Sequence, residues 1–153
     1  MDKNIDLTSA LVKLIEGQGR EAAELAARWP NQWVARCIIY LANSFFLYDP
    51  VTATEPFGGM EGINKLMESE CVERYFLRGH SARFRKEPDV ALSAFQSAAK
   101  LEPNNPFVEF SLVLMYAEQS SFGKLNKAIS EFGQKHPNHP LLYAINDMFE
   151  EQD

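Results

Sequence analysis

A few residues in this 153-residue chain have types that could do chemistry. His136 and His139 bracket a Pro-Asn turn, and imidazole is a common zinc ligand, but a zinc site needs further ligands and the sequence positions none. Glu68, Glu70 and Glu73 form a carboxylate cluster with no acid–base partner nearby, so we expect them to be solvated on helices. No Ser or Cys lies in a nucleophile motif. The sequence therefore predicts no catalytic residue, no metal and no cofactor.

Two other groups admit a functional and a structural interpretation. Residues 58–62, Gly-Gly-Met-Glu-Gly, precede a helical pattern and resemble a phosphate-binding loop, but they lack its Lys-Ser/Thr and follow no strand, so we expect a hinge and a helix start. Arg74, Arg78 and Arg85 fall on one helical stripe, which could meet an acidic partner surface or pair with neighbouring glutamates.

Composition and charge narrow the class of protein. Apolar residues make up 46% of the chain and the net charge is −6, which favours a folded protein and disfavours nucleic-acid or anionic-membrane binding. The start, MDKNIDLTSA, is polar and no signal-peptide segment follows it. The apolar stretch 33–48 is interrupted by Arg36, Asn43 and Ser44 and is too short to span a bilayer. With Cys37 and Cys71 outside any CxxC motif, we expect reduced thiols and a cytoplasmic location.

The elements that must position these residues all read as helices. Apolar residues recur at helical spacing along the chain, and no strand or hairpin pattern is present. We predict about nine short helices, with divergent helix pairs at 7–29 and 32–69. Residues 48–59 contain two prolines and two glycines and are predicted to be the longest loop.

A proline-bracketed turn recurs in the second half. EPNNPF at 102–107 and HPNHPL at 136–141 place prolines and an asparagine at offsets of 34. A 34-residue period with two helices is the spacing of the tetratricopeptide repeat (TPR). The unit 72–105 resembles that family in its large, small and closing positions, which are held by Tyr75, Gly79, Ala91, Phe95, Ala98 and Pro103. Arg78 and Ala82 depart from the family pattern. The unit 106–139 keeps Leu112, Tyr116 and Pro137 but loses the small residues.

The resemblance implies an all-α fold of antiparallel helix pairs, stacked as a short TPR-like superhelix. We therefore predict a single repeat domain over 1–153, with repeats at 72–105 and 106–139 and a C-terminal capping helix at 140–150. The alternative is an irregular helical bundle.

In the TPR family the first helix of each pair lines a concave groove. The resemblance assigns nine residues of this chain to such a partner-binding groove: Leu41, Phe45, Phe76, His80, Arg83, Phe84, Phe107, Phe110 and Leu114. The positions that form a carboxylate clamp in some family members are here Cys37, Leu41, Leu77, Phe107 and Ser111, which cannot form one. An exposed groove this apolar should be covered by a segment of another protein, by the chain's own loop or terminal helix, or by a second copy in a homodimer. The other interpretation is that these residues are core.

These observations lead to a functional hypothesis. We expect a non-catalytic module that binds a peptide or helical segment of a partner protein. The alternative is a small acidic bacterial secretion chaperone that holds an export client, which this chain resembles in length, acidity and helical content. An enzyme with a pocket shaped by residues 48–59 is a third hypothesis.

Overall fold

The computed structural model describes residues 2–149 and contains helices and turns but no strand within that stretch. The all-α prediction is therefore confirmed. The chain divides into two compact units, one ending at Leu77 and one beginning at Arg78, and each is described by itself. That both belong to one repeat domain stays a prediction. No helix among these residues is long and apolar enough to cross a bilayer.

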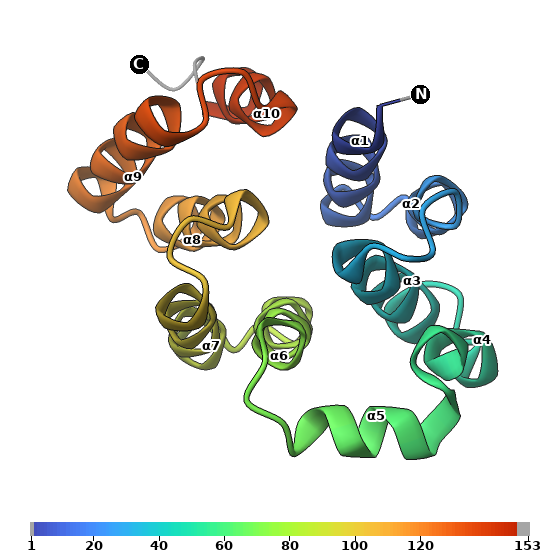
Figure 1. Cartoon of the computed structure of the whole chain (residues 1–153). Coiled ribbons are helices and arrows are strands. Elements are labelled where there is room, and N and C mark those ends of the chain that lie inside the picture. The colour runs from blue at the N-terminus through green and yellow to red at the C-terminus, as the bar shows by residue number, and fades with distance from the viewer. Residues whose placement is uncertain (1, 150–153) are drawn as a thin grey trace. The chain divides into compact units, whose positions relative to one another are not determined.

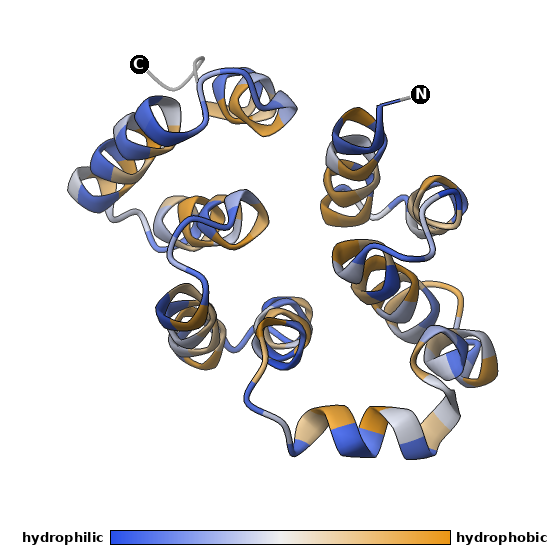
Figure 2. Ribbon diagram, in the orientation of Figure 1, coloured by the Kyte–Doolittle hydropathy of each residue, from blue (hydrophilic) through white to orange (hydrophobic). Residues whose placement is uncertain are grey.

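Six elements lie wholly within the first unit, where they follow one another in the chain and pack as neighbours (Figure 1). They are α1 (Lys3–Ile15), α2 (Gly19–Ala26), α3 (Trp33–Phe45), α4 (Pro50–Thr54), the 3-10 helix η1 (Glu55–Phe57) and α5 (Gly59–Met67). Its core begins at the α1 stripe Leu7, Leu11 and Leu14, where every side chain is at most 1% exposed. Figure 2 shows hydrophobic colouring along much of α1 and α3.

Three local contacts also stabilise the packing of α1, α2 and α3. Gly19 opens α2 beside Phe46, and a Cβ at residue 19 would lie 2.6 Å from Phe46 Cβ. The indole Nε1 of Trp29, three residues after the end of α2, donates a hydrogen bond to Asp6 Oδ2 of α1 at 2.9 Å. In α3 the buried Asn43 satisfies its amide by donating to the carbonyl oxygen of Ile39 at 2.9 Å.

Residues 48–59 differ from the prediction, because most of this stretch is helical. Asp49 caps α4 by accepting a hydrogen bond from the backbone N–H of Thr52 at 3.1 Å, and Pro50 occupies the first helical position. Residues 55–57 then form η1, and Gly58 and Gly59 adopt left-handed conformations with φ of +89° and +83°. The predicted long loop is therefore a short helix, a 3-10 turn and a glycine corner.

The second unit contains the 34-residue repeat. Helix α6 (Val72–Phe84) crosses the unit boundary, and α7 (Pro88–Leu101), α8 (Pro106–Glu118), α9 (Phe122–Lys135) and α10 (Pro140–Phe149) follow. The first and last residues of α8 lie 34 positions after those of α6, and those of α9 lie 34 positions after those of α7. The capping helix was predicted to reach residue 150, which lies outside the described residues.

The turns repeat as faithfully as the helices. Lys86 and Ser120, 34 residues apart, are both left-handed, with φ of +62° and +55°. The next residue in each turn closes the helix end in the same way: Glu87 N donates to Ala82 O, and Ser121 N donates to Tyr116 O, both at 2.9 Å. The periodicity of the sequence is therefore a periodicity of backbone structure.

Candidate functional site

The nine predicted groove residues are mostly interior. They lie on α3, α6 and α8, as predicted, but only Phe45, Arg83 and Phe84 are partly exposed. The other six are at most 7% exposed: Leu41, Phe76, His80, Phe107, Phe110 and Leu114. Their burial agrees with the interpretation that they are core, which the sequence left open beside the groove. Their role in partner binding stays a prediction.

Three of these residues belong to a chain of hydrogen bonds that joins α6 to α8. Ser111 Oγ donates its only proton to the carbonyl oxygen of Phe107 at 2.8 Å, so it accepts from His80 Nε2 at 2.9 Å. Because Nε2 then carries the ring proton, Nδ1 of a neutral imidazole accepts from Arg83 Nη1 at 3.4 Å. Arg83 in turn donates through Nε and Nη2 to Glu118 Oε1 at 3.0 and 2.8 Å.

The electrostatics of this chain of hydrogen bonds keep His80 neutral. Burial lowers the pKa of His80 well below its ordinary value, and the neighbouring Arg83 cation lowers it further. A serine–histidine pair that generates a nucleophile needs the opposite environment, with a carboxylate at Nδ1 to stabilise the imidazolium. Ser111 is also fully buried. The pair therefore joins α6 to α8 through a buried hydrogen bond between neutral side chains.

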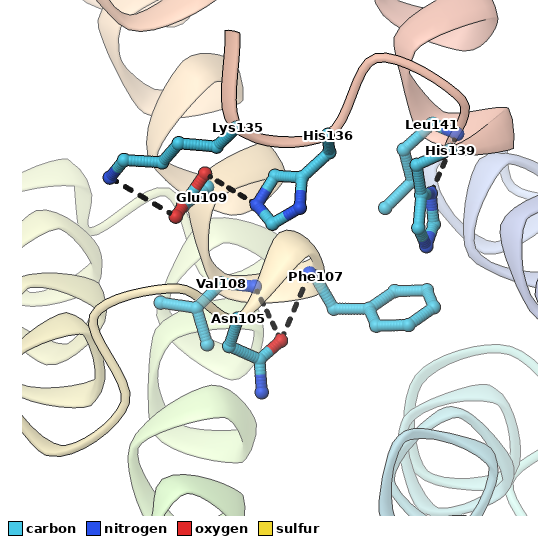
Figure 3. Close-up of polar contacts among 8 residues, drawn as sticks. All are labelled: Asn105, Phe107, Val108, Glu109, Lys135, His136, His139 and Leu141. Atoms are coloured by element: carbon cyan, nitrogen blue, oxygen red, sulfur yellow. Dashed lines mark hydrogen bonds and ion pairs between the residues drawn. The ribbon is translucent and has the colours of Figure 1, made fainter. Parts of the chain in front are cut away.

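The turn that carries His136 and His139 is held by contacts within the second unit (Figure 3). Glu109 Oε2 lies 3.1 Å from His136 Nε2, and Glu109 Oε1 lies 3.5 Å from Lys135 Nζ. His139 Nδ1 accepts the backbone N–H of Leu141 at 3.0 Å and so caps the start of α10. Within residues 2–149 no group of three His, Cys, Asp or Glu side chains is placed to hold a metal ion.

The same close-up shows the cap of α8. Asn105 Oδ1 accepts the backbone N–H groups of Phe107 and Val108 at 3.0 and 3.4 Å (Figure 3). This is the asparagine to which His139 corresponds one period later. Both residues of the repeated turn therefore cap a helix that a proline opens, which gives the turn a structural purpose.

The predicted arginine stripe and glutamate cluster meet at the start of α6. Arg74 Nη1 lies 3.0 Å from Glu70 Oε1, and Tyr75 donates its hydroxyl to the same oxygen at 2.6 Å. Arg78 is exposed. Arg74 and Glu70 therefore follow the structural interpretation of the stripe, in which a cation pairs with a neighbouring glutamate at the surface.

The first unit contains an open apolar hollow, which we call the α4–α5 hollow. Its volume is about 600 Å³, and it is lined by Pro50, Val51, Thr54, Glu55, Gly58, Gly59 and Met60. Val51 is 73% exposed and Met60 is 64% exposed, although both are large apolar residues. A pocket in this region was anticipated only in the enzyme hypothesis. Because residues 48–59 were predicted to be a loop, the sequence did not indicate which side chains would face a common hollow.

The polar groups of the hollow are few. The Thr54 hydroxyl is already bonded to the carbonyl oxygens of Pro50 and Val51, at 3.1 and 3.3 Å. Glu55 is the one ionisable residue in the lining. The arrangement suits the burial of apolar side chains better than the orientation of a polar substrate, which needs several convergent polar groups.

Comparisons with known proteins add no identification. No family model matches the chain, and no curated protein or solved structure matches it either.

Proposed function

We propose that this chain is a non-catalytic protein-interaction module of the cytoplasm, which binds a segment of a partner protein at the α4–α5 hollow. The observation that carries the proposal is the exposure of Val51 and Met60 in the lining of an apolar hollow. Tyr48 lies two residues before Pro50, the first lining residue in the chain. Its side chain is 79% exposed, and its backbone is left-handed with φ of +53°. Clustered apolar side chains kept in water are typical of contact surfaces.

The hollow supports this function better than the TPR-like groove residues do. Fully burying a large apolar side chain stabilises a fold by about 1.5–3 kcal/mol. Exposing several of the six buried groove residues to a partner would therefore lower the stability of the fold. The hollow needs no such rearrangement, because its apolar surface is already open. Kinship with the TPR family remains part of the proposal and rests on the 34-residue period of helices and turns.

The experiment is affinity capture from the native cell lysate with three proteins. They are the wild type, the double variant Val51→Ser/Met60→Ser, and the control variant Tyr143→Ser. Tyr143 is 66% exposed in the second unit, so its replacement removes a comparable apolar surface elsewhere. We expect the wild type and the control to retain the same partner in stoichiometric amounts, and the double variant to lose it.

Capture that is unchanged in the double variant would overturn the assignment to the hollow. Because all three positions are exposed, each variant is expected to keep the wild-type helical circular dichroism and melting temperature. Phe110→Glu would be a poor test of binding, because Phe110 is fully buried and its replacement would unfold the protein.

A further inference from the structure

The chain segment that lines the α4–α5 hollow is acidic. Residues 48–70 contain five carboxylates and one lysine, so this segment has a net charge of −4, while the whole chain has −6. Residues 48–62 contain no lysine or arginine at all. Three carboxylates of this stretch, those of Asp49, Glu55 and Glu61, belong to exposed residues.

These carboxylates are available as charges. Hydrogen bonds from Thr52 lower the pKa of Asp49, so this group stays anionic in mildly acidic solution. Glu61 lies 3.7 Å from Lys65 Nζ, but both side chains are more than three quarters exposed, so the pair is weak and easily exchanged for another cation. Glu55 is exposed and lies in the lining of the hollow itself.

The backbone beside these charges is also open. Gly58 and Gly59 have left-handed backbones, and no heavy atom lies within 4 Å of where a Cβ would stand on either. Side chains of a partner can therefore approach the main chain of the corner closely.

We infer that the hollow takes a cationic amphipathic segment, whose apolar side chains contact Val51 and Met60 while its lysines or arginines face Asp49, Glu55 and Glu61. This rests on the proposed function and specifies the partner's chemistry. An acidic segment would be repelled by the same carboxylates. A second copy of the chain is disfavoured, because a symmetric contact through the hollow would bring together two copies of residues 48–62, each with three carboxylates and no lysine or arginine.

The test uses three fluorescently labelled 18-residue peptides and measures binding by fluorescence anisotropy. The first is an amphipathic helix of leucine and lysine, the second replaces each lysine with glutamate, and the third scrambles the first so that it has no apolar face. We expect the first peptide to bind the wild type at least about tenfold more tightly than either of the others, with affinity falling as salt is raised.

Variants separate the two components of the site. Val51→Ser/Met60→Ser and Glu55→Lys/Glu61→Lys should each weaken the leucine–lysine peptide by about tenfold or more. The control Glu21→Lys/Glu24→Lys makes the same charge change at two exposed residues of α2 and should weaken it by less than about threefold.

Each other result overturns the inference in a recognisable way. If the glutamate peptide binds as well as the lysine peptide and only Val51→Ser/Met60→Ser weakens it, the cationic chemistry is wrong and the proposed function stands. If both charge variants weaken binding equally, the attraction is merely the net charge of the chain. If light scattering shows a dimer that Val51→Ser/Met60→Ser dissociates, the occupant is a second copy. If Val51→Ser/Met60→Ser binds every peptide as tightly as the wild type does, and also captures the same partner from lysate, the proposed function fails too.

Discussion

The ring of Phe95 on α7 fills the space that a side chain at Gly79 on α6 would need. A Cβ at residue 79 would overlap Cε1 of Phe95, whose side chain is fully buried. The His80 ring packs edge-on against Phe95 as well, with centroids 4.8 Å apart. Helices α6 and α7 therefore approach closely because residue 79 is a glycine, and the aromatic ring depends on that gap.

Replacing Gly79 with alanine should lower the free energy of unfolding by about 1–3 kcal/mol, because a methyl group forced into a filled core displaces its neighbours. This is opposite to the usual effect, since alanine is favoured over glycine in a helix by about 1 kcal/mol. Urea unfolding followed by circular dichroism measures the change.

Gly123→Ala is the matched control. Gly123 lies in the first turn of α9, and nothing lies within 4 Å of the position its Cβ would take. This variant should be as stable as the wild type or up to about 1 kcal/mol more stable. Equal stabilities of the two variants would mean that α6 and α7 do not need their close approach.

Much of the second unit was predictable from its sequence. The 34-residue offset of the prolines places the helix starts at Pro106 and Pro140, because a proline at the first helical position loses no hydrogen bond. The small residues Gly79, Ala91 and Ala98 predict close helix contact, and all three are buried in the structure. Local rules sufficed here because each turn carries its own signal.

The site was harder to predict. Helical spacing shows that Phe110 and Leu114 share a face, but it does not show what covers that face, so the sequence left both a groove lining and a core position open. Both side chains are buried in the structure. At Asp49-Pro50 the sequence does contain a helix-start signal, a capping aspartate before a proline. The two prolines and two glycines of residues 48–59 predicted a loop instead, so the side chains that line the hollow were not identified.

Stability should depend on pH through His80. Its pKa is lowered in the folded protein, so the unfolded chain binds the proton more readily. The free energy of unfolding should therefore be highest above the unfolded-state pKa of about 6.5, and should fall as the pH drops below it, by at most about 1.4 kcal/mol per pH unit for this one group. Urea unfolding at several pH values between 5 and 8 gives the slope.

His80→Gln isolates this contribution, since glutamine keeps an N–H donor for Ser111 but does not titrate. We expect the variant to be less stable at pH 8 and to show a shallower fall toward pH 5. Parallel curves for the two proteins would assign the pH dependence to other groups.

The two cysteines should differ sharply in reactivity. Cys37 is fully buried, and burial raises its pKa well above the ordinary value, with Glu73 raising it further. Cys71 is partly exposed. An aromatic disulfide reagent at pH 8 should therefore modify one thiol promptly in the native protein and two in denaturant. Cys71→Ser should remove the prompt reaction, whereas prompt labelling that persists in this variant would mean that Cys37 is accessible.

Gly62 should be indispensable to the shape of the α4–α5 hollow. A Cβ at residue 62 would overlap the carbonyl oxygen of Phe57 in η1, and a backbone atom cannot move aside by changing rotamer. In Gly62→Ala, α5 must shift away from η1, so amide hydrogen exchange should accelerate in residues 59–67 while α1 keeps its protection. Asn64→Ala is the control, because residue 64 is exposed on the same helix and alanine there favours the helix. If Gly62→Ala leaves exchange in α5 as slow as Asn64→Ala does, the corner between η1 and α5 is not fixed by this contact.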